Sequence, residues 1–423
     1  MTRSPFAAQG NGTARNEIEI MSPAGNFECL VAAMQGGANA IYFGAGKLNM
    51  RSRSANNFSI ADLPEIAERC GEKHIKTYLA ANTVMFDEDL AEMRELIDAA
   101  KDAGITAVIA ADPATIVRAR EKGVEVHLST QVNVTNFEAL RFYAPYADVL
   151  VPARELTLEQ VSEIHAGIIR SNLRGPGGQH IRIEMFAHGA LCMAVSGKCY
   201  LSLHEYGASA NRGSCYQVCR RSYRATDTET GRELELDSPY IMSPKDLCTI
   251  DFMDKMIAAG VRIFKIEGRA RSAEYVKTAT RCYSEAASAV ADGSYAPERI
   301  AKWKDTLATV FNRGFWDGYY LGRKLGELSE SHGSQATKRK TYLGRITNYY
   351  SNAGVAEILT EAGELKLKDE ILIIGPTTGA VEHAVEEIRT DDKPVSRSAK
   401  GEYCSVRLNE KVRRGDKVFL VGG

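Results

Sequence analysis

Five of the nine cysteines lie between residues 192 and 248, and their spacing determines the chemistry that this stretch can do. They are Cys192, Cys199, Cys215, Cys219 and Cys248. The first four are seven, sixteen and four positions apart. Four thiolates are the usual complement of a 4Fe-4S cluster, and they also suffice for a structural zinc ion. The spacing is not the paired Cys-x-x-Cys of zinc ribbons, but it leaves both metals open, and Cys248 is an alternative to Cys219 as the fourth ligand.

The other thiols have a different character. Cys29, Cys70 and Cys282 fall in helix-like runs and Cys404 in a strand-like run, which is typical of small buried residues. A disulfide scaffold is not expected in a large chain without an export signal. We therefore expect metal binding for the clustered thiols, with packing or redox thiols as the alternative.

Arginines and aromatic rings follow the cysteines closely. Residues 211–224 contain no carboxylate and include Arg212, Arg220, Arg221 and Tyr216. Arginines interleaved with rings can hold phosphates and stack bases, so these four residues are candidates for RNA binding. The alternative is a solvated loop whose arginines pair with acids elsewhere.

Alternating strand-like and helix-like runs must position these residues. Eight short apolar runs span residues 17–21, 40–43, 76–80, 107–111, 124–129, 148–151, 181–186 and 261–266, mostly with helical periodicity between them. This alternation is typical of a parallel sheet with helices outside. About eight units favour a closed, TIM-like (β/α) barrel over an open doubly wound sheet. No Gly-x-Gly-x-x-Gly follows the first run, so a dinucleotide-binding fold is disfavoured.

Polar residues gather where the predicted strands end, which is where such barrels carry their chemistry. They include Arg51, Asn82, Gln131 and Arg269. Glu184 and His188 would share one face of a strand if side chains alternate, and His188 could relay a proton at the rim. A satisfied core histidine is the alternative for His188, and a structural salt bridge is the alternative for either arginine.

Composition changes divide the chain into parts. We interpret residues 1–16, which are polar and small, as a disordered tail. Residues 17–330 form the predicted barrel domain, interrupted by a cysteine-rich insertion at 191–239. After a linker at 331–340, short strands and turns at 341–423 predict a small all-β barrel.

The charge balance restricts the partners. The 423 residues carry a formal net charge of −1, and the pI is about 6.7. A dedicated nucleic-acid binder is usually basic, so any RNA contact must come from local patches. No window approaches 18 uninterrupted apolar residues, and the first 16 residues lack the apolar core of a signal peptide. We therefore expect a cytoplasmic protein without a membrane span.

The run from Glu184 to Ser202 resembles the signature of peptidase family U32. The matching positions are Glu184, Phe186, Gly189, Ala190, Leu191, Cys192, Gly197, Cys199, Leu201 and Ser202. The similarity extends to residues 21–26, 265–269 and 311–315 and to the C-terminal β region. It therefore spans nearly the whole chain apart from the N-terminal tail.

The resemblance implies a cluster-dependent RNA-modifying enzyme. Branches of the family hydroxylate the wobble uridine of tRNA with prephenate, a cytidine of 23S ribosomal RNA, or ubiquinone precursors. A single catalytic domain with an added C-terminal β-barrel is most similar to the tRNA branch. By that resemblance Cys192, Cys199, Cys215 and Cys219 hold a 4Fe-4S cluster, tRNA or rRNA is the partner, and prephenate is the co-substrate. An electron-transfer partner is also expected.

A hydroxylase would need further groups, which the polar residues at the predicted strand ends could supply. Arg51 and Arg269 are candidates for holding a dicarboxylate, since arginine binds carboxylates bidentately. Asn82 and Gln131 are further candidates for substrate binding. Glu184 and His188 are the catalytic candidates.

Three alternatives stay open. The family name records a protease or collagenase assignment, but the sequence has no Gly-x-Ser-x-Gly and no His-Glu-x-x-His. A cysteine protease would need Cys192 and His188 in hydrogen-bonded geometry. A 23S rRNA cytidine hydroxylase is the second alternative, because the segment between Cys219 and Ser243 is shorter than in some tRNA-type relatives. A non-catalytic RNA-binding factor, with a structural metal but no small-molecule pocket, is the third.

Overall fold

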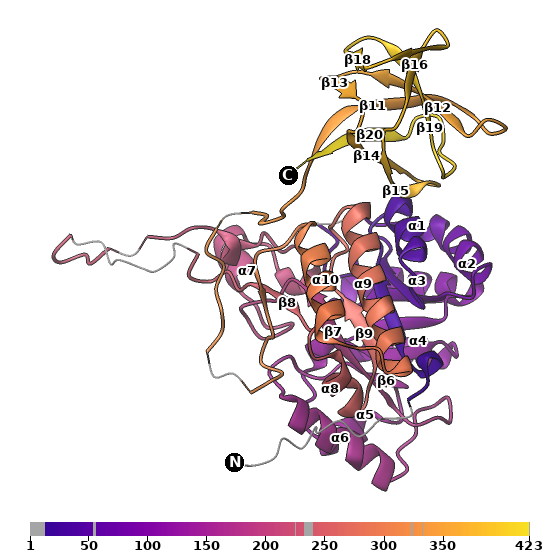
Figure 1. The fold of residues 1–423 in the computed structure, drawn as a ribbon. Helices are drawn as coiled ribbons and strands as arrows, with labels where there is room; N and C mark the ends of the chain where they lie inside the picture. Colours follow the sequence, from indigo (N-terminus) through magenta and orange to yellow (C-terminus); the bar gives the residue numbers. More distant parts are fainter. Residues whose placement is uncertain are drawn as a thin grey trace.

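Eight parallel strands close into a barrel in the computed structural model, which describes residues 13–53, 56–224, 226–231, 240–322, 325–331 and 333–422 (Figure 1). In spatial order the strands are β1 (Glu19–Pro23), β2 (Ala40–Gly44), β3 (Lys76–Ala81), β4 (Ala107–Ala110), β5 (Glu125–Leu128), β6 (Val149–Leu150), β7 (Arg182–Gly189) and β9 (Val261–Ile266). Strand β9 pairs in parallel with both β7 and β1, which closes the ring. The barrel prediction is confirmed, and the open-sheet alternative is wrong.

Helices cover the outside of the barrel (Figure 1). They are α1 (Phe27–Gln35), α2 (Leu63–Gly71), α3 (Leu90–Asp102), α4 (Pro113–Glu121), α5 (Phe137–Tyr143), α6 (Leu158–Arg170), α8 (Met253–Ala258), α9 (Ala273–Asp292) and α10 (Pro297–Ala308). Several start at a side-chain cap. Asn26 accepts a hydrogen bond from the backbone N–H of Cys29, and Asp112 accepts one from that of Ala114.

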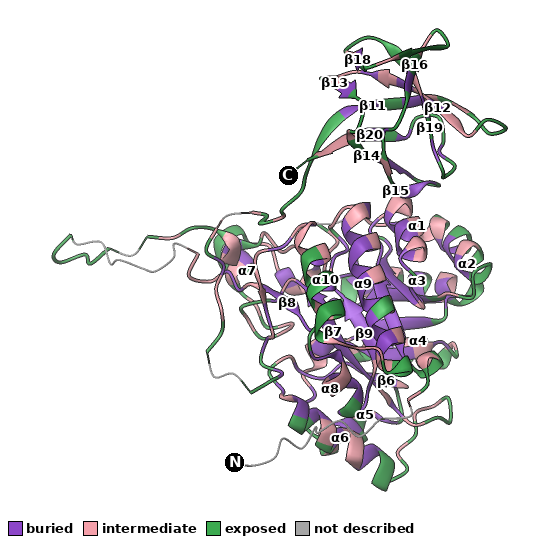
Figure 2. Ribbon diagram, viewed as in Figure 1, coloured by how far each residue is buried: buried purple, intermediate pink, exposed green. Residues whose placement is uncertain are grey.

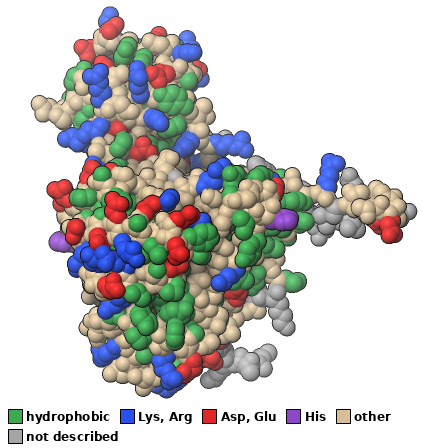
Figure 3. Space-filling model, turned by 180° about the vertical axis from the view of Figure 1, so that it is seen from behind, with side chains coloured by type: hydrophobic (Ala, Val, Ile, Leu, Met, Phe, Trp, Pro, Cys, Tyr) green, Lys and Arg blue, Asp and Glu red, His purple; other side chains and the backbone are tan. Residues whose placement is uncertain are grey.

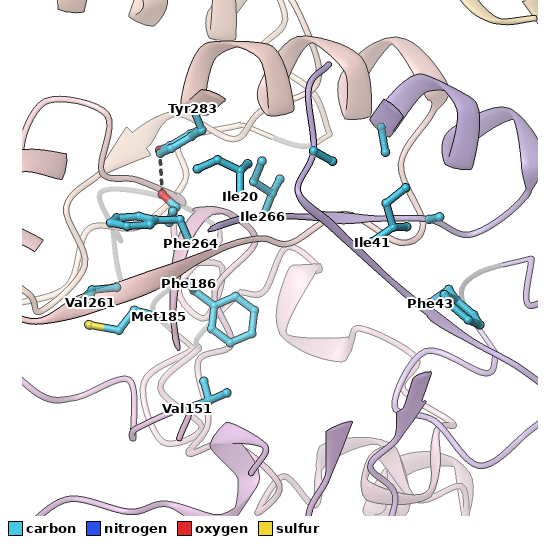
Figure 4. Close-up of a cluster of buried hydrophobic side chains, with 14 of the residues drawn as sticks. Ile20, Ile41, Phe43, Val151, Met185, Phe186, Val261, Phe264, Ile266 and Tyr283 are labelled. Carbon is cyan, nitrogen blue, oxygen red and sulfur yellow. Dashed lines mark hydrogen bonds between the residues drawn. The ribbon is translucent and has the colours of Figure 1, made fainter. Parts of the chain in front are cut away.

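The barrel strands are buried on both faces, because helices cover the outside and side chains fill the inside (Figure 2). On the outside, Tyr283 of α9 donates a hydrogen bond to the carbonyl oxygen of Ala187 in β7 at 2.7 Å, drawn as a dashed line in Figure 4. The inside departs from the branched apolar residues that usually fill such barrels. Glu19, Glu184 and Lys265 are buried there, so this interior depends on paired charges.

The cysteine-rich insertion follows β7 and contains the short helix α7 (Leu201–Tyr206). Residues 225 and 232–239 of the predicted insertion lie outside the described residues. Two short strands flank its base: β8 (Asp246–Cys248) runs antiparallel to the end of β7, and β10 (Phe315–Trp316) pairs in parallel with β8. The insertion therefore leaves the barrel at the carboxyl ends of the strands.

The predicted tail lies outside the described residues as far as Gly12. Its last part is not a free tail. Arg15 donates hydrogen bonds to the carbonyl oxygen of Ile18 and to the hydroxyl groups of Ser284 and Ser288 on α9. Arg15 and Asn16, which end the predicted tail, belong to a short 3-10 helix, Arg15–Glu17.

The C-terminal region is antiparallel and all-β, as predicted. Its strands are β11 (Arg339–Tyr350), β12 (Val355–Thr360), β13 (Glu364–Lys366), β14 (Glu370–Gly375), β15 (Gly379–Ala384), β16 (Ile388–Thr390), β17 (Lys393–Val395), β18 (Arg397–Ala399), β19 (Tyr403–Arg407) and β20 (Lys417–Gly422). They form an eight-stranded sheet and a separate pair, β13 with β18. Gln35 of α1 joins this region to the barrel by two hydrogen bonds, to the carbonyl oxygen of Thr378 and from the N–H of Ala380.

The surface carries both charge signs. Figure 3 shows Lys and Arg side chains interspersed with Asp and Glu on the face opposite to that of Figure 1. Within the described part of the chain, no helix is both long enough and apolar enough to cross a membrane.

Candidate active site and cysteine insertion

The four clustered thiols lie together in the insertion. Cys192 is exposed, and Cys199, Cys215 and Cys219 are half-buried. Burial raises the pKa of the Cys219 thiol, Arg220 lowers it, and the charges of the other three cysteines raise it further. Cys219 is thus within electrostatic range of each of the other three, although the four are spread over 28 positions of sequence.

Hydrogen bonds and close backbone contacts hold the insertion against the barrel. Arg220 donates to the carbonyl oxygens of Leu191 and Pro244, at 2.5 and 2.6 Å. Gly213 has a φ of +88°, and a Cβ there would lie 2.1 Å from the hydroxyl oxygen of Ser52. Only glycine allows this approach, which brings the loop that contains Cys215 against the loop that contains Arg51.

The four clustered thiols are candidate ligands for either metal. No three His, Cys, Asp or Glu side chains among the described residues are arranged to hold a single metal ion. A tetrahedral zinc ion needs its sulfur ligands at about 2.3 Å from one centre. A polynuclear cluster has its own inorganic core, so its thiols stand further apart. Four thiols on one insertion match the ligand number of a 4Fe-4S cluster, and which metal they hold stays a prediction.

Cys248 lies apart from this group. It is buried in β8, and the hydroxyl group of Tyr283 lies 3.9 Å from its sulfur. Burial raises the pKa of Cys248 to about 11. Its surroundings are those of a core thiol, and Cys219 is the better placed fourth candidate.

A cavity of about 100 Å³ opens beside Cys192 at the carboxyl ends of the strands. Its lining is cationic: Arg51, Arg154, Lys265 and Arg269 contribute to it, together with the carboxylate of Glu267. The neutral part of the wall includes Tyr42, Asn82, Gln131 and Phe186. The structure thus brings together four predicted residues, Arg51, Asn82, Gln131 and Arg269, with a predicted cysteine.

Glu267 is the single carboxylate among the described lining residues and accepts three hydrogen bonds from two partners. Arg51 donates from Nε and Nη2 to its Oε1 at 3.1 and 3.0 Å, and the hydroxyl group of Tyr42 donates to its Oε2 at 3.0 Å. Burial would raise the pKa of Glu267, but the charges of Arg51, Arg269 and Arg154 bring it down to about 2. Glu267 is therefore ionised and offsets part of the positive charge.

Two of the arginines keep unused donors. Nε and Nη1 of Arg154 and Nε of Arg269 are buried without an acceptor among the described residues. The side chain of Arg269 is 5% exposed, and its Nη1 donates to the side chain of Asn49 at 2.9 Å. Buried donors without acceptors are costly, and an anion in the cavity would supply acceptors for them.

Asn82 and Gln131 form a neutral pair in the wall. The amide nitrogen of Asn82 donates to the side-chain oxygen of Gln131 at 2.7 Å, and Gln131 donates back to the carbonyl oxygen of Asn82 at 2.7 Å. A Cβ at Gly197 of the insertion would lie 2.9 Å from the side chain of Gln131. This pair therefore positions the insertion as well as lining the cavity.

The prediction that Glu184 and His188 share one face of β7 is wrong. The pairing of β7 with β9 shifts register between Phe186 and His188, which is the mark of a β-bulge. Glu184 lies inside the barrel, where Lys265 donates to it at 2.7 Å. His188 faces α9 instead, with ring centroids 6.0 Å from Tyr275 and 5.6 Å from Tyr283. Burial lowers the pKa of His188 to about 3, and its Nδ1 has no partner among the described residues.

Sequence reasoning assigned no role to three other site residues. Lys265 lies between Glu184 and the cavity, and its ammonium nitrogen is 4.6 Å from the ring centroid of Tyr42. Behind it, His127 is within hydrogen-bonding distance of Glu184 at 3.2 Å. Strand alternation of Lys265, Glu267 and Arg269 was the available signal. The same alternation holds for His127, which follows Glu125 by two positions, and Arg154 stands shortly after the run 148–151.

Most predicted RNA-binding residues are engaged within the protein. Arg212 donates to Glu88 and Asp89, at 3.0 and 2.9 Å. Arg221 pairs with Glu205 at 2.6 Å. Tyr216 stacks on Tyr206 with ring centroids 4.5 Å apart, and the guanidinium carbon of Arg53 lies 3.9 Å from the Tyr216 centroid. Their role in RNA binding stays a prediction.

Comparison with known proteins gives this site a family context. The profile of peptidase family U32 matches residues 25–330. A protein named collagenase from Porphyromonas gingivalis is 57% identical over 404 residues, which cover 96% of this chain and 98% of that protein. A tRNA hydroxylation protein of Bacillus subtilis is 32% identical, covering 90% of this chain and 89% of its own. A 23S rRNA 5-hydroxycytidine synthase of Escherichia coli is also 32% identical, covering 74% of this chain and 46% of its own.

Proposed function

Because the chain belongs to peptidase family U32, we propose that it is an iron–sulfur-dependent RNA-modifying enzyme that hydroxylates the wobble uridine of tRNA with prephenate as co-substrate. One observation carries this proposal: Cys192 lines the same cavity as four cationic side chains. A dicarboxylate held by those cations would lie directly beside the thiols. Relatives named for tRNA and rRNA modification support an RNA substrate.

Cys192, Cys199, Cys215 and Cys219 would hold a 4Fe-4S cluster. When bound, such a cluster supplies electron-transfer chemistry, which the reaction requires because hydroxylation of a base is an oxidation. The other contribution of the protein is the placement of the thiols relative to the cavity. The exposed Cys192 lies nearest to the cavity, and Arg220 anchors the loop that contains Cys219 against the backbone of Leu191.

The cavity would hold the carboxylate groups of the co-substrate. Arg154 and Arg269 have buried N–H groups ready to donate, and arginine forks match carboxylates in shape and charge. Arg51 is held in place by Glu267, so it adds charge without moving. Such prearranged donors bind an anion without a large cost of reorganisation.

Proteolysis is the second candidate, since the relative named collagenase shares 57% identity. The geometry does not support a cysteine nucleophile activated by His188. Cys192 is exposed in the insertion, whereas His188 is 1% exposed and packs against Tyr275, Tyr283 and Phe315. A nucleophile needs its base within hydrogen-bonding reach.

The deciding experiment is mass spectrometry of tRNA nucleosides from a strain that lacks the gene. We expect the loss of wobble 5-hydroxyuridine, restored by the wild-type gene but not by Cys192→Ser or Arg154→Met. Phe142→Ala, an exposed ring on α5 away from the cavity, is the matched control and should restore the modification fully. Unchanged 5-hydroxyuridine in the deletion strain would overturn the tRNA assignment, and gelatin cleavage by purified protein that requires Cys192 would favour proteolysis.

A further inference from the structure

A second cavity, of about 340 Å³, lies on the other side of Cys192. It shares Arg154, Cys192 and Ser196 with the cationic cavity. A ligand in either cavity would therefore meet the same thiol and the same guanidinium group. The second cavity is therefore suitably placed for a reactant that must approach a small anion bound in the cationic cavity.

The walls of this second cavity have a different chemistry. Leu191, Leu247 and Trp316 form a buried apolar floor, while Met193, Val195 and Tyr319 lie at its exposed rim. Met193 is 51% exposed and Val195 48%. Apolar side chains gathered around a cavity and open to solvent mark a binding surface.

Two aromatic rings give the cavity a preferred ligand shape. The rings of Trp316 and Tyr319 have centroids 5.4 Å apart and an interplanar angle of 78°. The indole N–H of Trp316 donates to the carbonyl oxygen of Lys245 at 3.0 Å, which fixes that ring in place. Two rings at nearly a right angle offer a face and an edge to a third flat ring.

The charges of the cavity select against phosphate. Glu155 and Glu327 line it, and Arg154 is the one cation among its described lining residues. Glu327 is paired with Lys245 at 3.1 Å, whereas Glu155 is exposed. Carboxylates repel phosphate but accept hydrogen bonds from the N–H groups of a base.

From this we infer that the second cavity receives one pyrimidine base of the RNA, turned out of its stack, beside Cys192. The inference rests on the proposed function and adds to it the place of the base. Enzymes that act on a base must extrude it into a pocket, where ring stacking compensates for the lost stack. The cationic cavity then holds the small anion and the apolar cavity holds the base, with Cys192 and Arg154 between them.

The test is photocrosslinking with an anticodon stem-loop that contains 4-thiouridine at the wobble position. The full-length protein, purified without oxygen, is irradiated with this RNA, and crosslinked peptides are mapped by mass spectrometry. We expect crosslinks in residues 191–196 and 316–320. Crosslinks elsewhere on protein that retains the RNA would overturn the inference but leave the proposed function standing. Failure of the wild-type protein to retain the RNA would count against both.

A cavity-filling variant sharpens the test. A Cβ at Gly326 would lie 3.4 Å from the Trp316 ring and from the hydroxyl oxygen of Tyr319, so Gly326→Leu would cover both rings. We expect the crosslink yield to fall about tenfold, because base stacking on aromatic rings is lost. RNA retention should change by less than about twofold, since phosphate contacts dominate affinity.

A second variant and a control separate the effect of the lost ring from an effect of misfolding. Tyr319→Ala removes one ring without adding volume and should also lower the yield, while Phe142→Ala should leave it unchanged. An unchanged yield in both cavity variants would overturn the inference. So would a loss of dicarboxylate affinity in Gly326→Leu with the crosslinks intact, because the cavity would then belong to the co-substrate.

Discussion

The guanidinium group of Arg154 lies over the ring of Phe186, with its central carbon 4.0 Å from the ring centroid. This contact places the guanidinium group at the boundary of the two cavities that meet at Cys192. Nε and Nη1 have no acceptor in the part of the chain that the structure describes, and the contact with Phe186 helps to position the side chain. An arginine held in this way is ready for a ligand.

Replacing Arg154 by methionine should weaken binding of a small dicarboxylate by roughly 10- to 100-fold, since hydrogen bonds to charged groups contribute about 1.5–3 kcal/mol. The methionine keeps the apolar contact with Phe186, so the fold should be retained. Isothermal titration with prephenate measures the effect. Arg221→Met, which removes an arginine paired at the surface with Glu205, is the control. Equal affinities for Arg154→Met and the control would refute the assignment of Arg154.

Replacing Glu267 by glutamine separates stability from ligand binding. The partly buried Arg51 loses its countercharge, so the free energy of unfolding should fall by roughly 2 kcal/mol. Affinity for an anion should stay equal or increase, because the cavity becomes more positive. Denaturant unfolding measures the free energy of unfolding, and titration measures the affinity for the anion. Glu65→Gln, which breaks an exposed pair with Arg69 on α2, should cost under about 0.5 kcal/mol. A fall in anion affinity would show that Glu267 is needed to shape the cavity.

His188 should make stability depend on pH. Its folded pKa of about 3 lies below the unfolded value of 6.5, because burial disfavours the charged ring and Arg271 adds to this effect. The unfolded state therefore binds a proton first, and stability falls as the pH drops from 6.5 toward 3. Between pH 7 and pH 5 this group contributes a loss of about 2 kcal/mol.

The check is the difference between wild type and His188→Phe. The variant should lose this part of the pH dependence, while His204→Gln, an exposed histidine of α7, should keep it. The rings of Tyr275, Tyr283 and Phe315 pack against it, and Arg271 is the one charged group among the described residues that shifts its pKa. Parallel slopes for wild type and His188→Phe would show that the imidazole finds a proton acceptor.

Cys219 and Cys248 should behave differently on substitution. Cys219→Ser should abolish bound iron, acid-labile sulfide and visible absorption in protein purified without oxygen. Cys248→Ser should retain all three, because its sulfur lies in the core beside Tyr283. Analysis of iron and sulfide per chain measures both variants, and a thermal melt confirms that each is folded. Loss of iron from Cys248→Ser with Cys219→Ser intact would reverse the two assignments.

Most of the fold could be predicted from local patterns in the sequence. All eight barrel strands coincide with apolar runs, because short continuous apolar runs and the turns that flank them are local properties of the chain. Local patterns predicted less well which side of a strand a single residue faces. One register shift in β7 turned His188 toward α9, and a bulge leaves no mark in an alternating pattern.

The sequence predicted only part of the site, because local patterns do not show which residues meet across the fold. Arg51, Asn82, Gln131 and Arg269 were found because strand ends of a barrel converge on one mouth. Arg212 was expected to meet RNA, yet it pairs with Glu88 and Asp89, which lie more than 120 positions earlier in the chain. Long-range ion pairs of this kind have no local signature.

By itself, then, the sequence determined which chemical groups are present and on which kind of element each stands: clustered thiols after one strand, and arginines at the ends of others. Only the tertiary structure decided that Cys192 shares a cavity with Arg154 and Lys265, that Cys248 belongs to the core, and that His188 turns away from the mouth. The physical reason is that element type follows from local periodicity, whereas a binding site depends on contacts between residues far apart in the chain.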